Sequence, residues 1–355
     1  MTFERSRAPL APLTTIGLGG PADRLIRAES EEELIETVRE ADRDREKVFV
    51  IAGGSNVVIA DEGVHATAIH VASHGIKTAR EPDERVSLTV QAGEQWNAVV
   101  AASVADRLSG LECLAGIPGT TGATPIQNVG AYGQEVASTI TALRVYDRES
   151  GETVTLAPAD CGFGYRTSRF KGGDRYVVLA VTFTLTPSEL SEPVAYPQLA
   201  EALGIEVGQR APLSDVRIAV HALRRAKGMV IDPTDPDSVS VGSFFTNPVL
   251  TGSDFEQLQQ RAAERVGPDD QLPTYPAPEG RVKTSAAWLI ERSGFSRGYG
   301  DGDVGISDRH TLALINRGEG TTAELVALAR EIADGVERDF GVKLVPEPVF
   351  VGHSW

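Results

Sequence analysis

Hydrophobic and polar positions follow two different periods in the first third of the chain. Apolar residues recur at helical spacing between positions 34 and 41, directly after a capping box formed by Ser30 and Glu33. Residues 48–52 form a short continuous apolar run, and apolar residues alternate strictly with polar ones from 86 to 92. Both patterns are typical of strands. The order strand, helix, strand therefore predicts a small α/β unit.

The remainder of the chain continues with strands and then helices. The pattern predicts strands at 143–146, 153–156 and 176–185, and helices at 96–108, at 214–227, after a capping box at Ser253 and Glu256, and after a second one at Thr321 and Glu324 up to Gly341. Pro187 and Pro193 indicate a boundary near 186–200.

The segment 114–133 has neither period, and it contains five glycines and almost no charge. A segment of this length without regular structure is normally either disordered or functional. Disorder fits poorly, because Ile117, Ile126, Val129 and Tyr132 lie within it. We interpret it as an ordered loop whose glycines let the backbone approach a ligand closely.

Composition excludes several classes of protein. The 355 residues carry a formal charge of −16, which argues against a general nucleic-acid binder because neutralising phosphates needs a basic face. Small anions need only a local cluster, and 210–231 holds five basic residues against one acidic residue. No apolar run is long enough for a membrane span, and Cys113 and Cys161 form no metal or disulfide motif. We expect a monomeric cytoplasmic protein without bound metal, its two cysteines being small buried side chains.

Four short motifs contain candidate chemistry, and each leaves a plainer alternative open. The turn 53–56 presents successive backbone N–H groups to a pyrophosphate, or it is an ordinary glycine turn. Arg166 suits a carboxylate, or it is a surface residue. Ser243 could be a nucleophile or a proton donor, and the six histidines offer no obvious partner for it. Glu347 lies between two prolines, either as a functional carboxylate or as an edge-strand residue.

Taken together and in order, these segments resemble the bacterial UDP-N-acetylenolpyruvoylglucosamine reductases, a family of flavoenzymes. The matching segments cover nearly the whole chain and lie at 15–17, 53–57, 117–133, 163–166, 242–248 and 346–347. The resemblance implies an α+β fold, with an FAD-binding region of the vanillyl-alcohol-oxidase (PCMH) type in two α/β subdomains and a C-terminal α+β substrate-binding domain. The expected domains are 1–200, with the FAD-binding core at about 18–189, and 201–355, whose last strand returns to the active site.

The resemblance also assigns roles to the residues that match the family's motifs. It implies three catalytic residues, namely Arg166, Ser243 as the proton donor, and Glu347. It implies contacts to FAD from Gly53, Gly54, Ser55, Asn56, Ile117, Gly119, Thr120, Gln127, Asn128, Gly130 and Gly133. It implies contacts to the substrate from Tyr165, Tyr196, Lys227 and Asn247. Tyr196 corresponds to the tyrosine loop of the family's first subtype.

The reaction implied by the resemblance belongs to peptidoglycan precursor synthesis. NADPH would reduce the flavin, and the flavin would reduce UDP-N-acetylglucosamine enolpyruvate to UDP-N-acetylmuramate. Two alternatives remain open at this stage. One is another FAD-dependent oxidoreductase of the same superfamily, and the other is a sugar-nucleotide-binding module without catalytic activity.

Overall fold

The computed structural model describes residues 3–267 and 269–355, which form two compact units. The first unit contains the segment ending at Pro9, Pro21–Gly54 and Val64–Ile231, and the second contains Leu10–Gly20, Ser55–Gly63 and Asp232–Trp355. Both units are therefore built from separate stretches of chain. The sequence placed a domain boundary at 200/201, whereas residues 201–231 lie in the first unit because their apolar side chains pack into its core.

One sheet of the first unit has four strands in the order β1-β2-β5-β3. Its elements are β1 (Phe3–Pro9), β2 (Pro21–Ala28), α1 (Glu31–Asp44), β3 (Val48–Ile51) and β5 (Val64–Val71). β2, β5 and β3 are parallel, as the strand–helix–strand pattern predicts, and β1 is antiparallel to β2. Leu34 and Val38 of α1 are fully buried in a core shared with β2 and β5.

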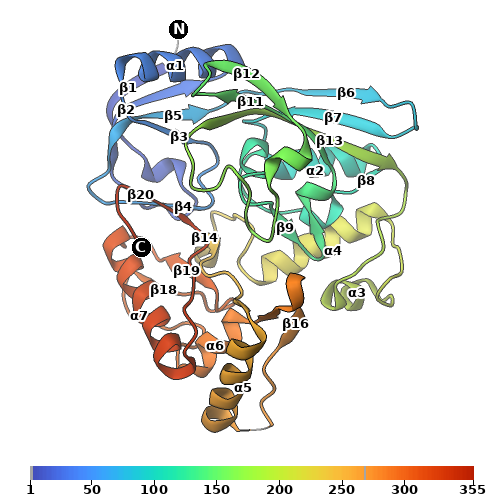
Figure 1. The fold of residues 1–355 in the computed structure, drawn as a ribbon, viewed down its shortest axis with the longest axis vertical. Helices are drawn as coiled ribbons and strands as arrows, with labels where there is room; N and C mark the ends of the chain where they lie inside the picture. Colours follow the sequence, from blue (N-terminus) through green and yellow to red (C-terminus); the bar gives the residue numbers. More distant parts are fainter. Residues whose placement is uncertain (1–2, 268) are drawn as a thin grey trace. The chain divides into compact units, whose positions relative to one another are not determined.

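The second sheet of this unit is antiparallel and follows the order β12-β11-β13-β7-β6, with β8 paired to β13. Its strands are β6 (Ile76–Arg80), β7 (Val86–Gln91), β8 (Leu108–Ser109), β11 (Ile140–Asp147), β12 (Glu152–Leu156) and β13 (Tyr176–Pro187). The helices of this part are α2 (Trp96–Ala105), α3 (Pro197–Leu203) and α4 (Leu213–Ala226). Buried side chains of β13, α2 and α4 form one continuous core. The apolar strand expected at 176–185 is thus the centre of the sheet (Figure 1).

The loop 114–133 is ordered and leads into a small hairpin. Its strands are β9 (Gly130–Ala131) and β10 (Gln134–Glu135). Tyr132 and Gly133, which connect the strands, have φ values of 49° and 88°. Positive φ at both central residues is the signature of a type I′ turn, whose twist matches that of a hairpin. The Gly-Ala-Tyr-Gly motif therefore encodes a tight turn that projects Tyr132.

The second unit packs three helices against short strands. Its elements are β4 (Val57–Ile59), β14 (Ser240–Ser243), β15 (Val249–Leu250), α5 (Gly252–Val266), β16 (Thr274–Pro276), β17 (Val282–Thr284), α6 (Ala286–Arg292), β18 (Val304–Ile306), β19 (Ala313–Asn316), α7 (Thr322–Phe340) and β20 (Val349–Val351). Three-stranded sheets form in the orders β14-β19-β18 and β15-β17-β16. β20 pairs in parallel with β4, although nearly 300 residues separate them (Figure 1).

Helix ends test the capping predictions directly. Ser30 accepts a hydrogen bond from the Glu33 N–H at 3.1 Å, and Thr321 forms the full capping box with Glu324, so both predictions are confirmed. The prediction at Ser253 is wrong, because the N-cap of α5 is Thr251, two residues earlier. The helix predicted to reach 108 ends at Ala105, since Leu108 joins β13 as part of β8.

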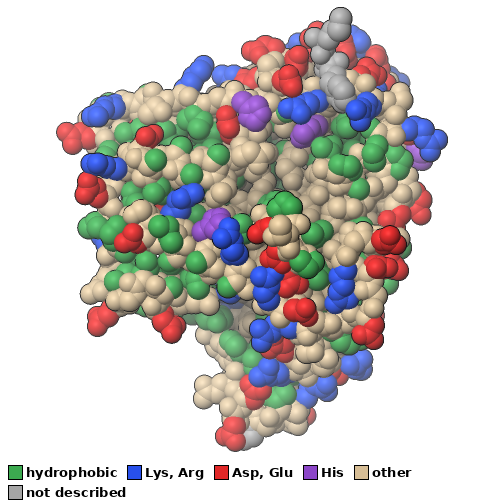
Figure 2. Space-filling view, turned by 180° about the vertical axis from the view of Figure 1, so that it is seen from behind, with side chains coloured by type: hydrophobic (Ala, Val, Ile, Leu, Met, Phe, Trp, Pro, Cys, Tyr) green, Lys and Arg blue, Asp and Glu red, His purple; other side chains and the backbone are tan. Residues whose placement is uncertain are grey.

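The surface carries mixed charge. On the face drawn in Figure 2, lysine and arginine side chains alternate with aspartate and glutamate, with no broad basic area. Across the stretches 3–267 and 269–355, no helix is both long and apolar enough to cross a bilayer.

Candidate functional site

The two glycine-rich segments of the first unit lie against each other. A Cβ on Gly53 would lie only 2.5 Å from the Gly119 Cα, so the two backbones touch where no side chain fits. Gly54 has φ 55° and Gly119 has φ 107°, both in the left-handed region that favours glycine. Thr120 is buried, and its Oγ1 has no hydrogen-bond partner among the described residues. Apposed glycine backbones with an unsatisfied hydroxyl beside them fit a cofactor that approaches both loops closely.

Asn128 has a supporting place in this loop. Its side-chain amide donates to Glu135 at 2.8 Å and to the Gly164 carbonyl at 3.1 Å, while its oxygen accepts from the Ala137 N–H at 3.1 Å. Asn128 is 2% exposed and has a positive φ of 46°. The side chain thus ties the loop to the turn that carries Arg166. Its neighbours Ile117 and Gln127, expected to contact the cofactor, are partly buried in the same loop.

Arg166 lies at the tip of a tight turn. The N–H groups of Gly164 and Thr167 each donate to the other's carbonyl, at 3.0 and 3.3 Å. Arg166 has a left-handed φ of 53°, a conformation that costs a non-glycine residue about 1–2 kcal/mol and is common at functional sites. Its Nη2 donates to the Gly130 carbonyl at 2.7 Å, and its guanidinium lies 5.5 Å from the Tyr165 ring centroid. The turn therefore holds a permanent positive charge in a defined direction.

Tyr132, Tyr196 and Lys227 form a group of side chains that we call the tyrosine cluster. Tyr196 and Lys227 are two of the expected substrate contacts, and Tyr132 is their neighbour. The tyrosine rings meet edge to face with centroids 5.4 Å apart, and the Lys227 Nζ lies 6.0 Å from the Tyr132 centroid. Lys227 Nζ also donates to Gln198 at 2.9 Å. Burial lowers the pKa of Lys227, and the nearby Arg224 guanidinium lowers it further. Tyr196 is 44% exposed, so the cluster has an open side.

Arg224 is a feature of the site that sequence reasoning counted only as part of a basic island. Its Nη2 donates to the Met229 carbonyl at 2.9 Å, while its buried Nε has no hydrogen-bond partner within the described part of the chain. Burial lowers the pKa of Arg224 to about 10, and the Arg166 charge acts in the same direction. The available signal was its spacing of three residues from Lys227, which places Arg224 in the last turn of α4 just before that lysine.

Ser243 occupies the end of β14 in the second unit. β14 pairs with β19 through an irregular register, with Ser240 opposite Ile315 and Ser243 opposite Ala313. The extra residue and the positive φ of Gly242, 78°, describe a β-bulge. Bulges redirect the side chain that follows them and are frequent beside active sites. Here the bulge sets the direction of Ser243.

Glu347 is positioned by segments from two distant parts of the sequence. Its N–H donates to the Phe244 carbonyl at 2.8 Å, which places it beside the segment that carries Ser243. On its other side, the side-chain amide of Asn56 donates to the Glu347 carbonyl at 3.2 Å. The backbone carbonyl of Asn56 accepts from the Val349 N–H at 3.0 Å. The second unit thus brings together Ser243, Glu347 and the Ser55–Asn56 end of the glycine turn.

The structure gives Ser243 a histidine partner that was not obvious from the sequence. His310 Nε2 lies 3.4 Å from Ser243 Oγ, although 67 residues separate them in sequence. No local sequence motif indicates this pairing, because it depends on the contact between β14 and β19.

The predicted residues are divided between the two units. Arg166, Tyr165, Tyr196 and Lys227 lie in the first, and Ser243, Glu347 and Asn247 in the second. Asn247 Oδ1 accepts from the Ala286 N–H at 3.0 Å, at the start of α6. Both cysteines are buried, and burial raises the pKa of Cys113 to about 12 and that of Cys161 to about 11. The prediction that they are small buried side chains is confirmed.

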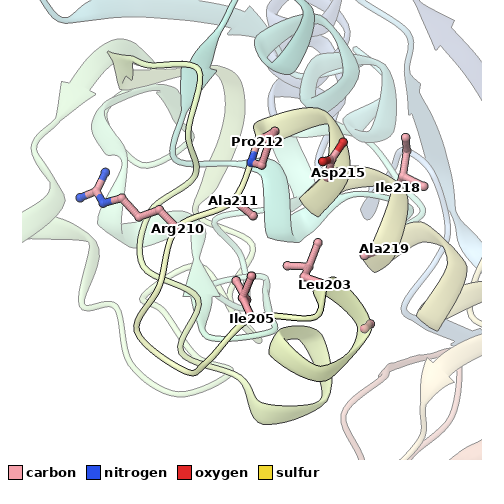
Figure 3. A pocket seen from close by; sticks show the side chains of 9 residues that line it. Leu203, Ile205, Arg210, Ala211, Pro212, Asp215, Ile218 and Ala219 are labelled. Atoms are coloured by element: carbon pink, nitrogen blue, oxygen red, sulfur yellow. The ribbon is translucent and has the colours of Figure 1, made fainter.

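A mostly apolar pocket of about 410 Å³ lies elsewhere in the first unit, between α3 and α4 (Figure 3). Its lining residues include Leu203, Ile205, Ile218 and Ala219, with Arg210 and Asp215 as charged members. It contains none of the predicted catalytic, cofactor or substrate residues, so we do not take it as the functional site.

Comparison with known proteins identifies two matching regions in this chain. Residues 22–157 match the family model described as an FAD binding domain, and residues 233–351 match the C-terminal domain of UDP-N-acetylenolpyruvoylglucosamine reductase. The expected fold class is thereby confirmed. A solved structure of a UDP-N-acetylenolpyruvylglucosamine reductase from Thermus caldophilus has the same fold, with a TM-score of 0.65 and 23% identity over 99% of each chain.

Sequence similarity to curated relatives extends from end to end. The chain is 56% identical over 351 residues to the UDP-N-acetylenolpyruvoylglucosamine reductase of Thermobifida fusca, with 99% of this chain and 98% of the relative covered. It is 55% identical over 347 residues to that of Streptomyces coelicolor, with 97% and 89% covered. The chain therefore belongs to the UDP-N-acetylenolpyruvoylglucosamine reductase family.

Proposed function

We propose that this protein reduces UDP-N-acetylglucosamine enolpyruvate to UDP-N-acetylmuramate, with FAD as the resident cofactor and NADPH as the reductant. The observation that carries the proposal is the pairing of the Ser243 and Glu347 segments beside Asn56, within a chain related over its full length to enzymes of this name. A binding module would have no need of a serine aimed by a bulge and paired to a histidine.

The cofactor would be held by the turn at 53–56 and the loop at 117–133. Gly53 and Gly119 let the two loop backbones pack directly against each other, and the Thr120 hydroxyl beside them supplies an unsatisfied polar atom. When bound, FAD supplies hydride storage and transfer. The chain's own residues must then bind the substrate, stabilise developing charge and deliver a proton.

Charge stabilisation falls to Arg166. Adding a hydride to one end of the enolpyruvyl double bond leaves negative charge on the other carbon, delocalised into the substrate carboxylate. A guanidinium already oriented by the Gly130 carbonyl can meet that charge without reorganising, which is the condition for an effective electrostatic contribution. Glu347 is proposed as the polar neighbour of the same carboxylate region.

Proton delivery falls to Ser243. The α-carbon must gain a proton after the hydride arrives, and the Ser243 hydroxyl is the proposed donor. A serine hydroxyl is a weak acid, so it needs a hydrogen-bonded partner that replaces its proton.

The tyrosine cluster and Asn247 are the proposed contacts to the substrate diphosphate. Lys227 supplies positive charge, and Tyr196, on its exposed side, supplies a phenol beside that charge. Tyr196 also supports assignment to the subtype with a tyrosine loop. Tyr165 is the further proposed substrate contact, 40% exposed beside Arg166. Cytoplasmic localisation and a monomeric state complete the proposal.

Stopped-flow absorbance of the flavin tests the function in two steps. The purified protein should be yellow, NADPH should bleach it, and UDP-N-acetylglucosamine enolpyruvate should restore the colour with formation of UDP-N-acetylmuramate. Ser243→Ala should keep the first step and lose rapid reoxidation. A colourless protein that takes up no flavin, or a reduced flavin that the substrate does not reoxidise, would refute the proposal.

A further inference from the structure

We propose that His310 is a positioning residue that acts through Ser243 by replacing the proton that the serine gives to the substrate; this inference rests on the proposed function. Its starting observation is the 3.4 Å contact between Ser243 Oγ and His310 Nε2. That contact is longer than an ideal hydrogen bond, as is common for catalytic hydrogen bonds before the substrate binds.

The contact follows from strand pairing. Ser243 is opposite Ala313 in the β14–β19 ladder, and the next N–H, that of Phe244, donates to the Leu312 carbonyl at 2.7 Å. The chain preceding β19 must therefore run alongside Ser243. His310 is three residues before Ala313, whose N–H donates to the His310 carbonyl at 3.0 Å. This turn returns the imidazole toward the serine.

The loop that carries His310 is fixed from several sides. Ser307 is fully buried, and its hydroxyl accepts from the N–H groups of Arg309 at 3.0 Å and His310 at 3.2 Å. The Arg309 guanidinium is paired with Asp237 at 2.7 Å and also with Asp235. Thr311 donates its hydroxyl hydrogen bond to Glu291 of α6. Such a network is more than a surface loop needs, and it limits the positions open to the imidazole.

The proposed proton transfer is balanced. The Ser243 O–H bond breaks as a C–H bond forms at the substrate α-carbon, and the Nε2–H bond of the His310 imidazolium breaks as a new O–H bond forms at Ser243. The neutral imidazole then recovers its proton from solvent. No electrons move in these steps, and the serine is never left as a free alkoxide. Histidine suits this task because its unperturbed pKa lies near neutrality.

Two replacements of His310 separate proton transfer from simple support of the serine. His310→Gln keeps a hydrogen-bonding group of similar reach but cannot relay a proton, and His310→Ala removes both. We expect both variants to be reduced by NADPH at the wild-type rate, with reoxidation by the enolpyruvyl substrate about 10²-fold slower, the usual scale of general acid–base catalysis. The loss should fall on kcat, with KM for the substrate within threefold of wild type. His65→Gln, a highly exposed histidine, is the matched control.

The double variant Ser243→Ala/His310→Gln supplies the decisive comparison. Groups that act as one unit give non-additive losses, so the double variant should be no slower than Ser243→Ala alone. Reoxidation of His310→Gln within threefold of wild type, or losses that multiply in the double variant, would overturn the role of His310. A wild-type protein that fails to reduce the enolpyruvyl substrate at all would instead refute the proposed function, so the two failures are distinguishable.

Discussion

Gly130 can be replaced to test whether Arg166 acts from a fixed position. Gly130→Ala would put a Cβ 2.8 Å from both the Gln134 carbonyl oxygen and Glu135 Cγ, and 3.1 Å from Arg166 Nη1. The φ of Gly130 is not in the left-handed region, so the substitution adds no backbone strain of that kind. Its whole effect comes from crowding, and the hairpin and the guanidinium must move apart.

The expected magnitude follows from these contacts. Overpacking of this kind costs about 1–3 kcal/mol of stability. A displacement of about 1 Å at a positioned catalytic group costs about 10²-fold in rate, equal to about 2.7 kcal/mol of transition-state stabilisation. We therefore expect kcat for the enolpyruvyl substrate to fall about 10²-fold in Gly130→Ala. Removing the guanidinium by Arg166→Ala should cost about 3 kcal/mol or more.

Steady-state NADPH oxidation, together with the two half-reactions, measures this prediction. Flavin reduction by NADPH should be unchanged, and the double variant Gly130→Ala/Arg166→Ala should be no slower than Arg166→Ala. Gly173→Ala is the control in the same unit, since its Cβ would meet only the Arg169 carbonyl at 3.9 Å. If Gly130→Ala turned over within threefold of wild type while Arg166→Ala was strongly impaired, the Gly130 contact would have no part in placing the arginine.

Three further variants test other parts of the site. Gly53→Ala would place a Cβ 2.5 Å from the Gly119 Cα, so the protein should lose FAD on gel filtration; full flavin absorbance would contradict this. Burial lowers the pKa of Lys227, so its charge is lost at lower pH than for an ordinary lysine, and KM for the substrate should rise as pH increases through that lowered pKa. Lys227→Arg should move the rise to higher pH, and an identical profile would exclude Lys227 as its cause. Gly242→Ala forces an alanine to φ 78° at about 1–2 kcal/mol, and slowed flavin reoxidation with unchanged NADPH reduction should show that Ser243 is misdirected.

Elements with strong local signals could be predicted from the sequence. The start of α1 and both ends of α7 follow from their capping residues, and β13 follows from a long apolar run rich in β-branched residues. The N-cap of α5 was misplaced because Thr251 and Ser253 are both good capping residues, and only the position of the helix decides between them.

Contacts between distant segments could not be predicted from local patterns. The pairing of His310 with Ser243 depends on the register of β14 against β19, which includes an unpredicted bulge. The place of residues 201–231 was also missed, because the prolines near 187–193 mark an exposed connection rather than the end of a compact unit. Hydrophobic periodicity shows which face of a helix is buried, but not which core receives it.

The parallel pair of β4 and β20 has a consequence for the order of folding during synthesis. Residues 349–351 leave the ribosome long after residues 57–59. β4 therefore cannot pair with β20 until almost the entire chain has been synthesised. The first unit, whose segments end at Ile231, can fold much earlier. Because closing so long a loop is slow relative to local contacts, we expect assembly of the second unit to be the late event in folding. Deletion of the last seven residues, which removes β20, should leave a folded first unit and an incomplete second one, detectable by limited proteolysis.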